Sequence, residues 1–446
     1  MAITYNYLKN VWSKLLNESK KNISFLPLVL LMVTIPLPLG INNFFLGLFV
    51  LTVIFNKNRP KINFSIALIL PIVLFLWMSF SFFWSIDGAR TLKAIPREIS
   101  LLILPILFLS VSITQQQKLK AIHIYSYAMT LLVIFYLVRA IIRFGITQDS
   151  NVFFYHGEYD NDYGLVPKLL NAIHFSVFVA IAFFYFITQE VKTKITLFIS
   201  VLLFSFIVLL SSKNIILVVI TLIVIYFLFY SKIANRMRLR NLIVMMILFG
   251  LMFSLGKIKQ RFQIEFQTNT TKSLSSNVIK GIPDGVHNVS IYEAWFNDGF
   301  TPNDFFPGTA FRVYQARLFT EFIKEEPIFW QGFGLNASYK KLEEKGLKYN
   351  VFQGNETTEG YQKKNFHNQY IQVFAELGII GLILFVMLLF LNIKKAFNKK
   401  DFIHIAFAIL MISLFLTESF LWRQRGVVFF TVFYCLFNMK SINNKY

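Results

Sequence analysis

Long apolar stretches recur along the whole chain and constrain its fold more than any other feature. A helix needs roughly 20 mostly apolar residues to cross the hydrocarbon layer of a membrane, and a helix satisfies all of its backbone hydrogen bonds internally. The pattern therefore predicts an all-α, polytopic integral membrane protein with about 12 transmembrane helices. The expected spans are residues 23–40, 43–56, 65–84, 98–113, 121–142, 171–188, 194–211, 214–231, 241–256, 369–391, 402–422 and 426–439.

The basic residues indicate how these spans are oriented. The net charge is +21, which in a soluble protein would suggest a nucleic-acid partner, but 56% of the residues are hydrophobic and only 15% are charged. If the N-terminus is cytoplasmic, the cytoplasmic segments hold 21 Lys and Arg, and the short connections on the other side hold 8. The positive-inside rule then predicts that both termini are cytoplasmic, and nucleic acid is no longer an expected partner. The seven cytoplasmic segments are residues 1–22, 57–61, 118–120, 192–194, 232–240, 394–400 and 440–446.

The N-terminus resembles a signal peptide because four lysines precede the first apolar stretch. That stretch is too long for the apolar region of a signal peptide and lacks an obvious small-residue cleavage site. We expect it to be retained as the first span, forming a tight hairpin with the second across Gly40–Asn43. The only cysteine, Cys435, excludes a disulfide within the chain and a cysteine-based metal site.

One long hydrophilic segment interrupts the apolar pattern and is expected on the outer side of the membrane. Its charges are nearly balanced, with 14 Lys and Arg against 12 Asp and Glu. The expected division of the chain is an N-terminal transmembrane bundle of about nine helices (1–256), this large loop (257–366) and about three C-terminal transmembrane helices (367–446).

Short helices are expected inside the large loop. Apolar residues at helical spacing predict an amphipathic helix over 309–326 that Pro327 ends. A second helix is expected over 336–345, closed by Gly346, whereas residues 268–304 are expected to form a loop.

Three residues on the predicted outer side could carry chemistry. Lys213 lies in a very tight turn between two spans, Arg312 lies near the start of the amphipathic helix, and His367 lies where the large loop re-enters the membrane. A histidine near polar groups can act as a general base, because its ordinary pKa is close to ambient pH. Taken singly, each residue also has a plain structural explanation: a lysine that reaches the interface, a surface arginine, or an interfacial polar side chain.

Other polar residues lie on the same side. His174 begins the sixth span, Asn368 follows His367, and Glu418 is close to Arg423 and Arg425 in the last outer turn, where an interfacial ion pair is the alternative explanation. No histidine pair has metal-ligand spacing, and no nucleotide-binding motif occurs, so neither a metal nor a nucleotide is expected.

Several motifs occur in a recognisable order. A Ser-Ser-Lys turn is followed by Phe-Arg-x-Tyr, then by Pro327-Ile-Phe-Trp-Gln-Gly-Phe-Gly, then by His367-Asn-x-x-Ile with Glu376-Leu-Gly-x-x-Gly, and Thr417-Glu-Ser stands near the end. This order resembles the O-antigen ligase and polymerase superfamily, over about residues 165–435. Glycines of the His-Asn motif, Gly378 and Gly381, are expected to allow close helix approach.

The resemblance implies a GT-C-like fold in the bacterial inner membrane and a metal-independent, inverting glycosyl transfer at the periplasmic face, with no cofactor. The donor would be a glycan on undecaprenyl pyrophosphate, and the acceptor a sugar hydroxyl of the lipid A core or another lipid-linked glycan. His367 matches the residue that activates the acceptor hydroxyl, and Arg312 matches an arginine assigned to the pyrophosphate. Lys213 stands where members usually have arginine. The remaining substrate-binding candidates are Asn368, His174, Arg423, Arg425 and Glu418.

The leading hypothesis is an O-antigen ligase. An O-antigen polymerase that extends lipid-linked repeats is the closest alternative, and a protein O-oligosaccharyltransferase is a third. A transporter of lipid-linked sugars belongs to a different class, but neither inverted repeats nor paired broken helices are visible in the sequence.

Overall fold

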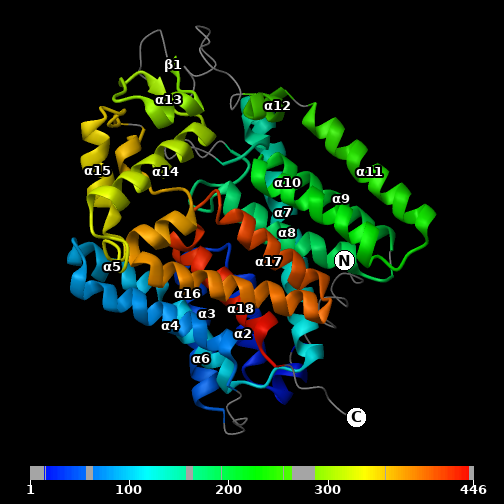
Figure 1. Cartoon of the computed structure of the whole chain (residues 1–446). Helices are drawn as coiled ribbons and strands as arrows, with labels where there is room; N and C mark the ends of the chain where they lie inside the picture. Colours follow the sequence, from blue (N-terminus) through cyan, green and yellow to red (C-terminus); the bar gives the residue numbers. More distant parts are fainter. Residues whose placement is uncertain are drawn as a thin grey trace.

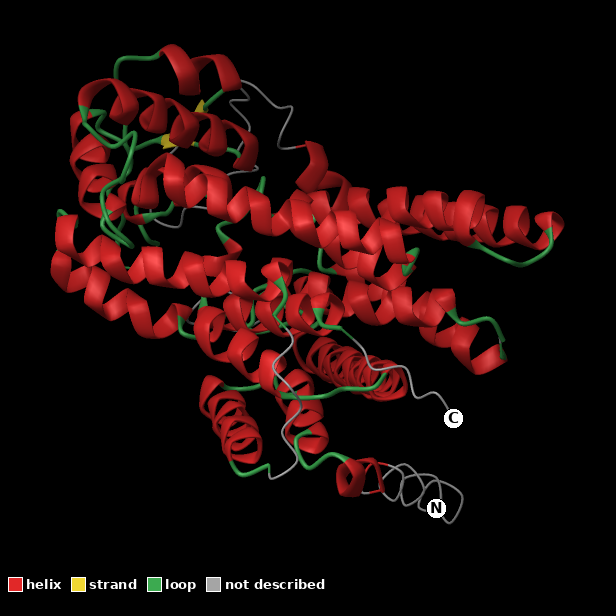
Figure 2. Ribbon diagram, turned by 60° about the horizontal axis from the view of Figure 1, so that its bottom comes forward, coloured by secondary structure: helices red, strands yellow, loops and turns green. Residues whose placement is uncertain are grey.

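The computed structural model describes residues 15, 17–56, 64–156, 164–191, 193–254, 256–263, 287–356 and 358–440. Helices make up nearly all of the regular structure in these ranges, as Figure 2 shows, so the expected all-α class is confirmed. The two strands found in these ranges, β1 (His287–Asn288) and β2 (Asp304–Phe305), pair in parallel, with His287 opposite Asp304.

Every expected span contains a helix. Within the described ranges, four segments are long and apolar enough to cross a membrane, namely Ile66–Trp84, Gln115–Thr147, Lys213–Tyr230 and Gln369–Lys399. That the remaining helices also cross stays a prediction. The span helices are α2 (Phe25–Val33), α3 (Leu39–Ile54), α4 (Ile66–Phe80) with the 3-10 turn η1 (Ser81–Trp84), α6 (Ser100–Ser110), α7 (Gln115–Thr147), α8 (Ala172–Thr188), α9 (Lys194–Leu209), α10 (Lys213–Ile225) with the π-helical η3 (Tyr226–Tyr230), α11 (Asn235–Phe253), α16 (Gln369–Lys399), α17 (Phe402–Leu414) and α18 (Gln424–Asn438).

Two expected boundaries are wrong. The first hairpin turns between α2 and α3 at residues 34–38, where Pro38 precedes α3, so Gly40–Asn43 lies inside a helix. The eleventh span was expected to run to residue 422, but α17 ends at Leu414 and a loop follows. Additional short helices lie between the spans: α5 (Gly88–Glu98), η2 (Ser150–Phe153), α12 (Gly256–Gln263) and η6 (Phe420–Trp422).

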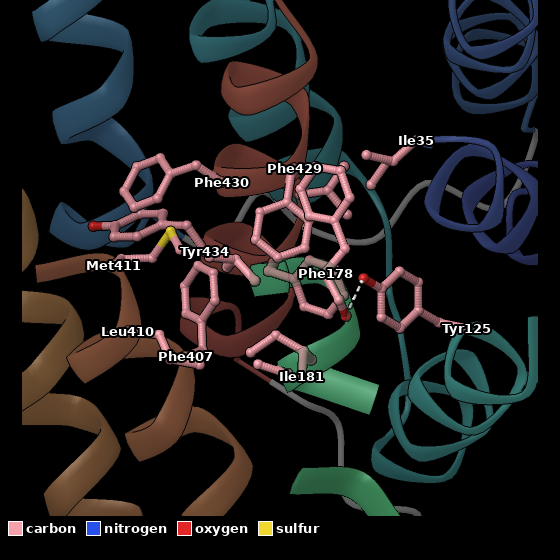
Figure 3. Packing of buried hydrophobic residues seen from close by; sticks show 14 of the residues in the cluster. Ile35, Tyr125, Phe178, Ile181, Phe407, Leu410, Met411, Phe429, Phe430 and Tyr434 are labelled. Atoms are coloured by element: carbon pink, nitrogen blue, oxygen red, sulfur yellow. Dashed lines mark hydrogen bonds between the residues drawn. The ribbon is translucent and has the colours of Figure 1, made fainter. Parts of the chain in front are cut away.

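Aromatic side chains fill the centre of the bundle. Figure 3 shows Phe178 of α8 packed against Phe429 of α18, with 4.4 Å between the ring centroids. The buried hydroxyl of Tyr125 on α7 donates to the carbonyl of Phe178 at 2.9 Å, so its polar atom is satisfied inside an apolar core. Phe407 of α17 joins the same cluster, which therefore links the early helices to the last two.

Polar contacts join the connections between helices into two groups, at opposite ends of α18. At its start, Arg425 donates to the carbonyls of Ile35 (3.0 Å), Leu37 (3.1 Å) and Leu169 (2.6 Å). At its end, Lys395 donates to the carbonyl of Asn438, and nearby connections are joined by the pairs Lys118–Asp401 (3.1 Å) and Lys120–Glu18 (2.6 Å). The connections joined at the start of α18 are those expected on the outer side, and the connections joined at its end are those expected on the cytoplasmic side.

The described residues between 287 and 366, here called the loop domain, have a hydrophobic core of their own. Its helices are α13 (Ile291–Phe296), α14 (Gly308–Glu325), α15 (Ser338–Lys348) and the short η5 (Tyr361–Lys363). They lie together at the upper left of Figure 1, over one end of the bundle.

The helix expected over 309–326 is confirmed as α14, and Pro327 follows its end. The second helix is longer than expected, because Gly346 lies inside α15 rather than closing it. Residues 287–304 are not all loop: Ser290 and Glu293 form a reciprocal capping box that starts α13. The rest of that expected loop, residues 268–286, lies outside the described residues.

A glycine-rich turn clamps the loop domain onto α16. Gly378 interrupts α16 with a φ of 66°. The backbone groups of α16 next to this interruption form hydrogen bonds with the turn at residues 329–334. Phe333 and Gly334 donate to the carbonyls of Ala375 and Glu376, both at 2.8 Å, and Ile379 donates to the carbonyl of Phe329 at 2.8 Å. Gly332 and Gly334 of one motif and Gly378 of the other therefore serve this backbone clamp, and the segment that approaches Gly378 closely is a turn rather than the expected helix.

We expect Gly378→Ala to lower the stability of the folded protein. The positive φ alone costs about 1–3 kcal/mol for a residue with a side chain, and a Cβ atom would overlap the backbone of Trp330. The apparent melting temperature in detergent measures the effect. Gly47→Ala is the matched control, because a Cβ at Gly47 meets nothing within 4 Å. Equal melting temperatures for the two variants would contradict the clamp.

Candidate active site

The connection between α17 and α18, residues 415–423, is the meeting point of the predicted site residues; we call it the α17–α18 loop. The first turn of α16 holds it in place. The backbone N–H of Gln369 donates to the carbonyl of Phe415 at 2.8 Å, and the side-chain oxygen of Gln369 accepts from the N–H of Leu421 at 2.9 Å.

His367 lies beside this loop. Its backbone has a φ of 47°, and its Nδ1 lies 3.4 Å from Oε2 of Glu418. The imidazole side chain is 30% exposed, whereas the carboxylate side chain is only 8% exposed. A carboxylate at Nδ1 favours the tautomer that leaves Nε2 free to accept a proton.

Glu418 is held as a carboxylate. Burial by itself would raise its pKa, but His367, His174 and Arg423 have the larger combined effect and lower the pKa to about 2. The group therefore remains negatively charged at neutral pH and can orient the His367 ring.

Glu418→Gln should reduce the stability of the folded protein in a pH-dependent way. A depressed pKa stabilises the folded state above the ordinary value of 4.5, and the stabilisation is lost as the pH falls towards about 2. The difference in melting temperature between wild type and Glu418→Gln should thus be full at neutral pH and shrink on acidification below 4.5. Glu190→Gln, at an exposed carboxylate beside Lys232, is the control and should change little. A difference that is constant with pH would contradict the assignment.

Arg312 reaches the same loop from α14. Its Nε donates to the carbonyl of Thr417 at 3.0 Å and its Nη1 donates to the carbonyl of Gly308 at 2.9 Å. The guanidinium group of Arg312 is thus hydrogen-bonded to the residue that directly precedes Glu418 in the chain. Arg317, on the same helix, is buried instead among Glu321, Tyr349 and Asn297 of the loop domain, where it stabilises the fold.

Lys213 is the first residue of α10 and is half-buried. Its neighbour Asn214 donates to the carbonyl of Ser413 and to Oγ1 of Thr417, both at 2.8 Å. The α17–α18 loop therefore contacts the Lys213 turn and Arg312 through a single residue, Thr417.

The other predicted residues have different surroundings. Asn368 caps α16 and donates to the carbonyl of Leu416 at 3.2 Å, so it positions the helix that follows His367. His174 is buried with its ring 4.4 Å from that of Phe420. Arg423 is exposed at the start of α18. Arg425 is engaged by the three backbone carbonyls described above, which gives it a structural contact rather than a place beside His367.

The sequence did not single out Lys364, which lies close to His367. Its Nζ is 4.6 Å from the centre of the Tyr361 ring and 5.6 Å from that of Phe311, whose ring packs edge-on against His367. Burial lowers the pKa of Lys364, Glu359 opposes this effect and Lys168 adds to it. A lysine in a polar loop has no distinguishing sequence pattern, so only the fold identifies it.

Metal ligands are not clustered in the described ranges: no group of three His, Cys, Asp or Glu residues there is placed to hold an ion. Among the described residues, cationic side chains near the His367–Glu418 pair include Arg312, Lys364 and Arg423.

The described residues form a helical bundle with segments long and apolar enough to span a membrane, as in an all-α membrane protein. A polar site with cations and a histidine–carboxylate pair lies at one end of the bundle. Residues 198–386 match the family model described as O-Antigen ligase, and this match supports the resemblance of the chain to the O-antigen ligase superfamily. The match supports an O-antigen ligase or polymerase type of function, that of a glycan-transferring enzyme. No curated protein matches the chain.

The matched region covers only part of the site. It contains Lys213, Arg312 and His367, whereas His174 precedes it and Glu418 and Arg423 follow it. The α17–α18 loop, which contacts Arg312 and His367, therefore extends the candidate site beyond the matched region.

Proposed function

We propose that the protein transfers a glycan from undecaprenyl pyrophosphate to a sugar hydroxyl of the lipid A core, at the periplasmic face of the bacterial inner membrane. One observation carries the proposal most. A candidate base and a candidate anion-binding side chain are anchored at adjacent residues of one loop, His367 at Glu418 and Arg312 at Thr417. Such an arrangement suits a hydroxyl nucleophile and an anionic leaving group.

The reaction is a single displacement. Nε2 of His367 takes the proton of the acceptor hydroxyl as its oxygen attacks the anomeric carbon from the face opposite the leaving group. The bond from the anomeric carbon to the pyrophosphate oxygen breaks, and its electron pair stays on undecaprenyl pyrophosphate. The new linkage therefore has inverted configuration.

Fixed cations stabilise the leaving group. The developing negative charge on the pyrophosphate needs positive charge already in place, which Arg312 and Lys213 supply, so the proposed reaction needs no metal ion. Glu418 keeps the His367 ring oriented and stabilises the positive charge that forms on it. The donor's lipid stays in the membrane while its glycan reaches the loop domain.

The proposal is tested with purified full-length protein, lipid-linked donor and lipid A core acceptor, with a chelator and without nucleotide. Product is the expected result, and its absence with active donor and acceptor would refute the proposal. A deletion strain then separates the alternatives. Loss of long glycan from the lipid A core indicates a ligase, a single attached repeat indicates a polymerase, and unchanged lipopolysaccharide with altered glycoproteins indicates a protein oligosaccharyltransferase.

Lys213→Arg should retain at least about half of the wild-type rate, because arginine keeps the positive charge and can bind a phosphate through two parallel hydrogen bonds. Lys213→Ala should lose most of the activity. The transfer rate with saturating donor measures both. A severe loss in Lys213→Arg would mean that the lysine has a role that an arginine cannot fill.

A further inference from the structure

Two neighbouring aromatic rings with an arginine at each end form a row beside the site, in the order Arg90, Tyr339, Trp422 and Arg97. The guanidinium carbon of Arg90 lies 5.6 Å from the centre of the Tyr339 ring, and that ring lies 5.3 Å from the ring of Trp422. The guanidinium carbon of Arg97 lies 4.8 Å from the centre of the Trp422 ring. The row joins α5, the first turn of α15 and η6. The Thr91 hydroxyl of α5 also donates to the carbonyl of Leu335, just before α15, at 2.7 Å.

The two arginines of this row differ in their partners. Arg90 is paired with Asp87 at 3.2 Å and with Glu343 at 3.8 Å. Arg97 has neither a hydrogen bond nor an ion pair with any residue that the structure describes, and its Nε is buried. A cation–π contact fixes its position without using its N–H donors. Arg97 therefore presents unused donors from a fixed place.

Arg423 adds a second guanidinium at the same place. It follows Trp422 directly in the chain, it is exposed, and its side chain has no acceptor within the described ranges. Two buried carboxylates, Glu98 and Glu376, lie within electrostatic range of Arg97 but do not contact it. Glu376 accepts instead from Ser338 at 2.9 Å and from Gln372.

The order of contacts along the α17–α18 loop suggests which substrate this pair serves. Thr417 contacts Arg312, Glu418 contacts His367, and Trp422 contacts Arg97. In the order of the chain, the contact with the proposed base therefore falls between the contact with Arg312 and the contact with Arg97. In an inverting displacement the anomeric carbon lies between the leaving group and the acceptor hydroxyl, and the base lies on the acceptor's side. Cations on the far side of the base from Arg312 are therefore placed for the acceptor.

We propose that Arg97 and Arg423 bind an oxyanion on the acceptor glycan, either a phosphate ester or a sugar carboxylate. This inference rests on the proposed glycosyl transfer for the identity of the acceptor. Guanidinium groups bind both kinds of anion through paired hydrogen bonds.

The test measures binding of a lipid-free core oligosaccharide to the purified full-length protein. Three forms of this probe are compared: intact, phosphatase-treated, and carboxyl-reduced. Arg97→Gln and Arg423→Gln should each weaken binding of the intact probe about tenfold or more, whereas the matched control Arg90→Gln should stay within about twofold. Removing the recognised anion from the probe should weaken its binding to the wild-type protein by the same factor as the arginine substitutions do. The same removal should not weaken binding to Arg97→Gln any further. If Arg97→Gln does not fold, as judged by its melting temperature, the exposed Arg423→Gln serves as the test.

Several results would overturn the inference. These are no binding of the intact probe to wild type, equal binding of all three probes, wild-type affinity in both variants, or a raised KM for the donor with an unchanged KM for the acceptor. Binding needs no turnover, so the two proposals can fail separately. Arginine-dependent binding without glycan transfer refutes the proposed function alone, whereas transfer without arginine-dependent binding refutes this inference alone.

Discussion

His367→Ala should reduce glycan transfer by about 10²–10⁴-fold or more, since removing a positioned general base has an effect of that size. The protein should still insert and fold, because the His367 ring is partly exposed and its contacts are the edge of Phe311 and one carboxylate oxygen. The initial rate of product formation, with donor and acceptor both saturating, measures the effect. The binding of each substrate should change little, because the lost interaction acts as the hydroxyl is deprotonated.

The matched control is His287→Ala. His287 lies in the loop domain and contacts Glu293 at 3.2 Å, away from the α17–α18 loop, so its replacement should leave transfer within about twofold of wild type. Full activity in His367→Ala would overturn the assignment of the base. Equal losses in both variants would point instead to a damaged loop domain.

Arg312→Ala should reduce transfer by about 10²–10³-fold, the loss usual when a group that stabilises developing negative charge is removed. The pyrophosphate would lose a cation that is anchored at Thr417, and the α17–α18 loop would lose one of its contacts. Arg312→Lys should recover part of the rate, because it restores the charge without the two-pronged geometry. Initial rates over a range of donor concentrations measure the loss.

Lys324→Ala is the control for this variant. It removes a positive charge from the last turn of the same helix, at an exposed position. Its rate should match that of wild type. If Arg312→Ala were fully active, the cations that stabilise the leaving group would have to be sought elsewhere, first at Lys364.

The sequence predicted the helices well because each depends on local information. Apolar runs of sufficient length identify the span helices, and the spacing of Phe311, Tyr314 and Leu318 identifies α14 together with Pro327. The sides of the membrane predicted from the positions of Lys and Arg stay a prediction; the structure groups the connections at the two ends of α18.

The features that the sequence did not reveal depend on contacts between distant residues. Gly378 looks like an ordinary helix glycine, and only the approach of the 329–334 turn explains its left-handed backbone. The sequence made Arg425 a substrate-binding candidate and did not single out Arg97. The fold gives Arg425 three carbonyl partners and leaves Arg97 without an acceptor in the described ranges, a difference that no local pattern encodes.

The three hydrogen bonds of Arg425 have a consequence for biosynthesis. The carbonyls of Ile35 and Leu37 emerge from the ribosome early, and the guanidinium that they accept from is made 390 and 388 residues later. When the first hairpin is synthesised, the donor that these two carbonyls accept from in the folded protein has therefore not yet been made. Because α18 carries the partner of these carbonyls, a chain that stops before this helix would carry most of the proposed site residues and still lack the three hydrogen bonds of Arg425.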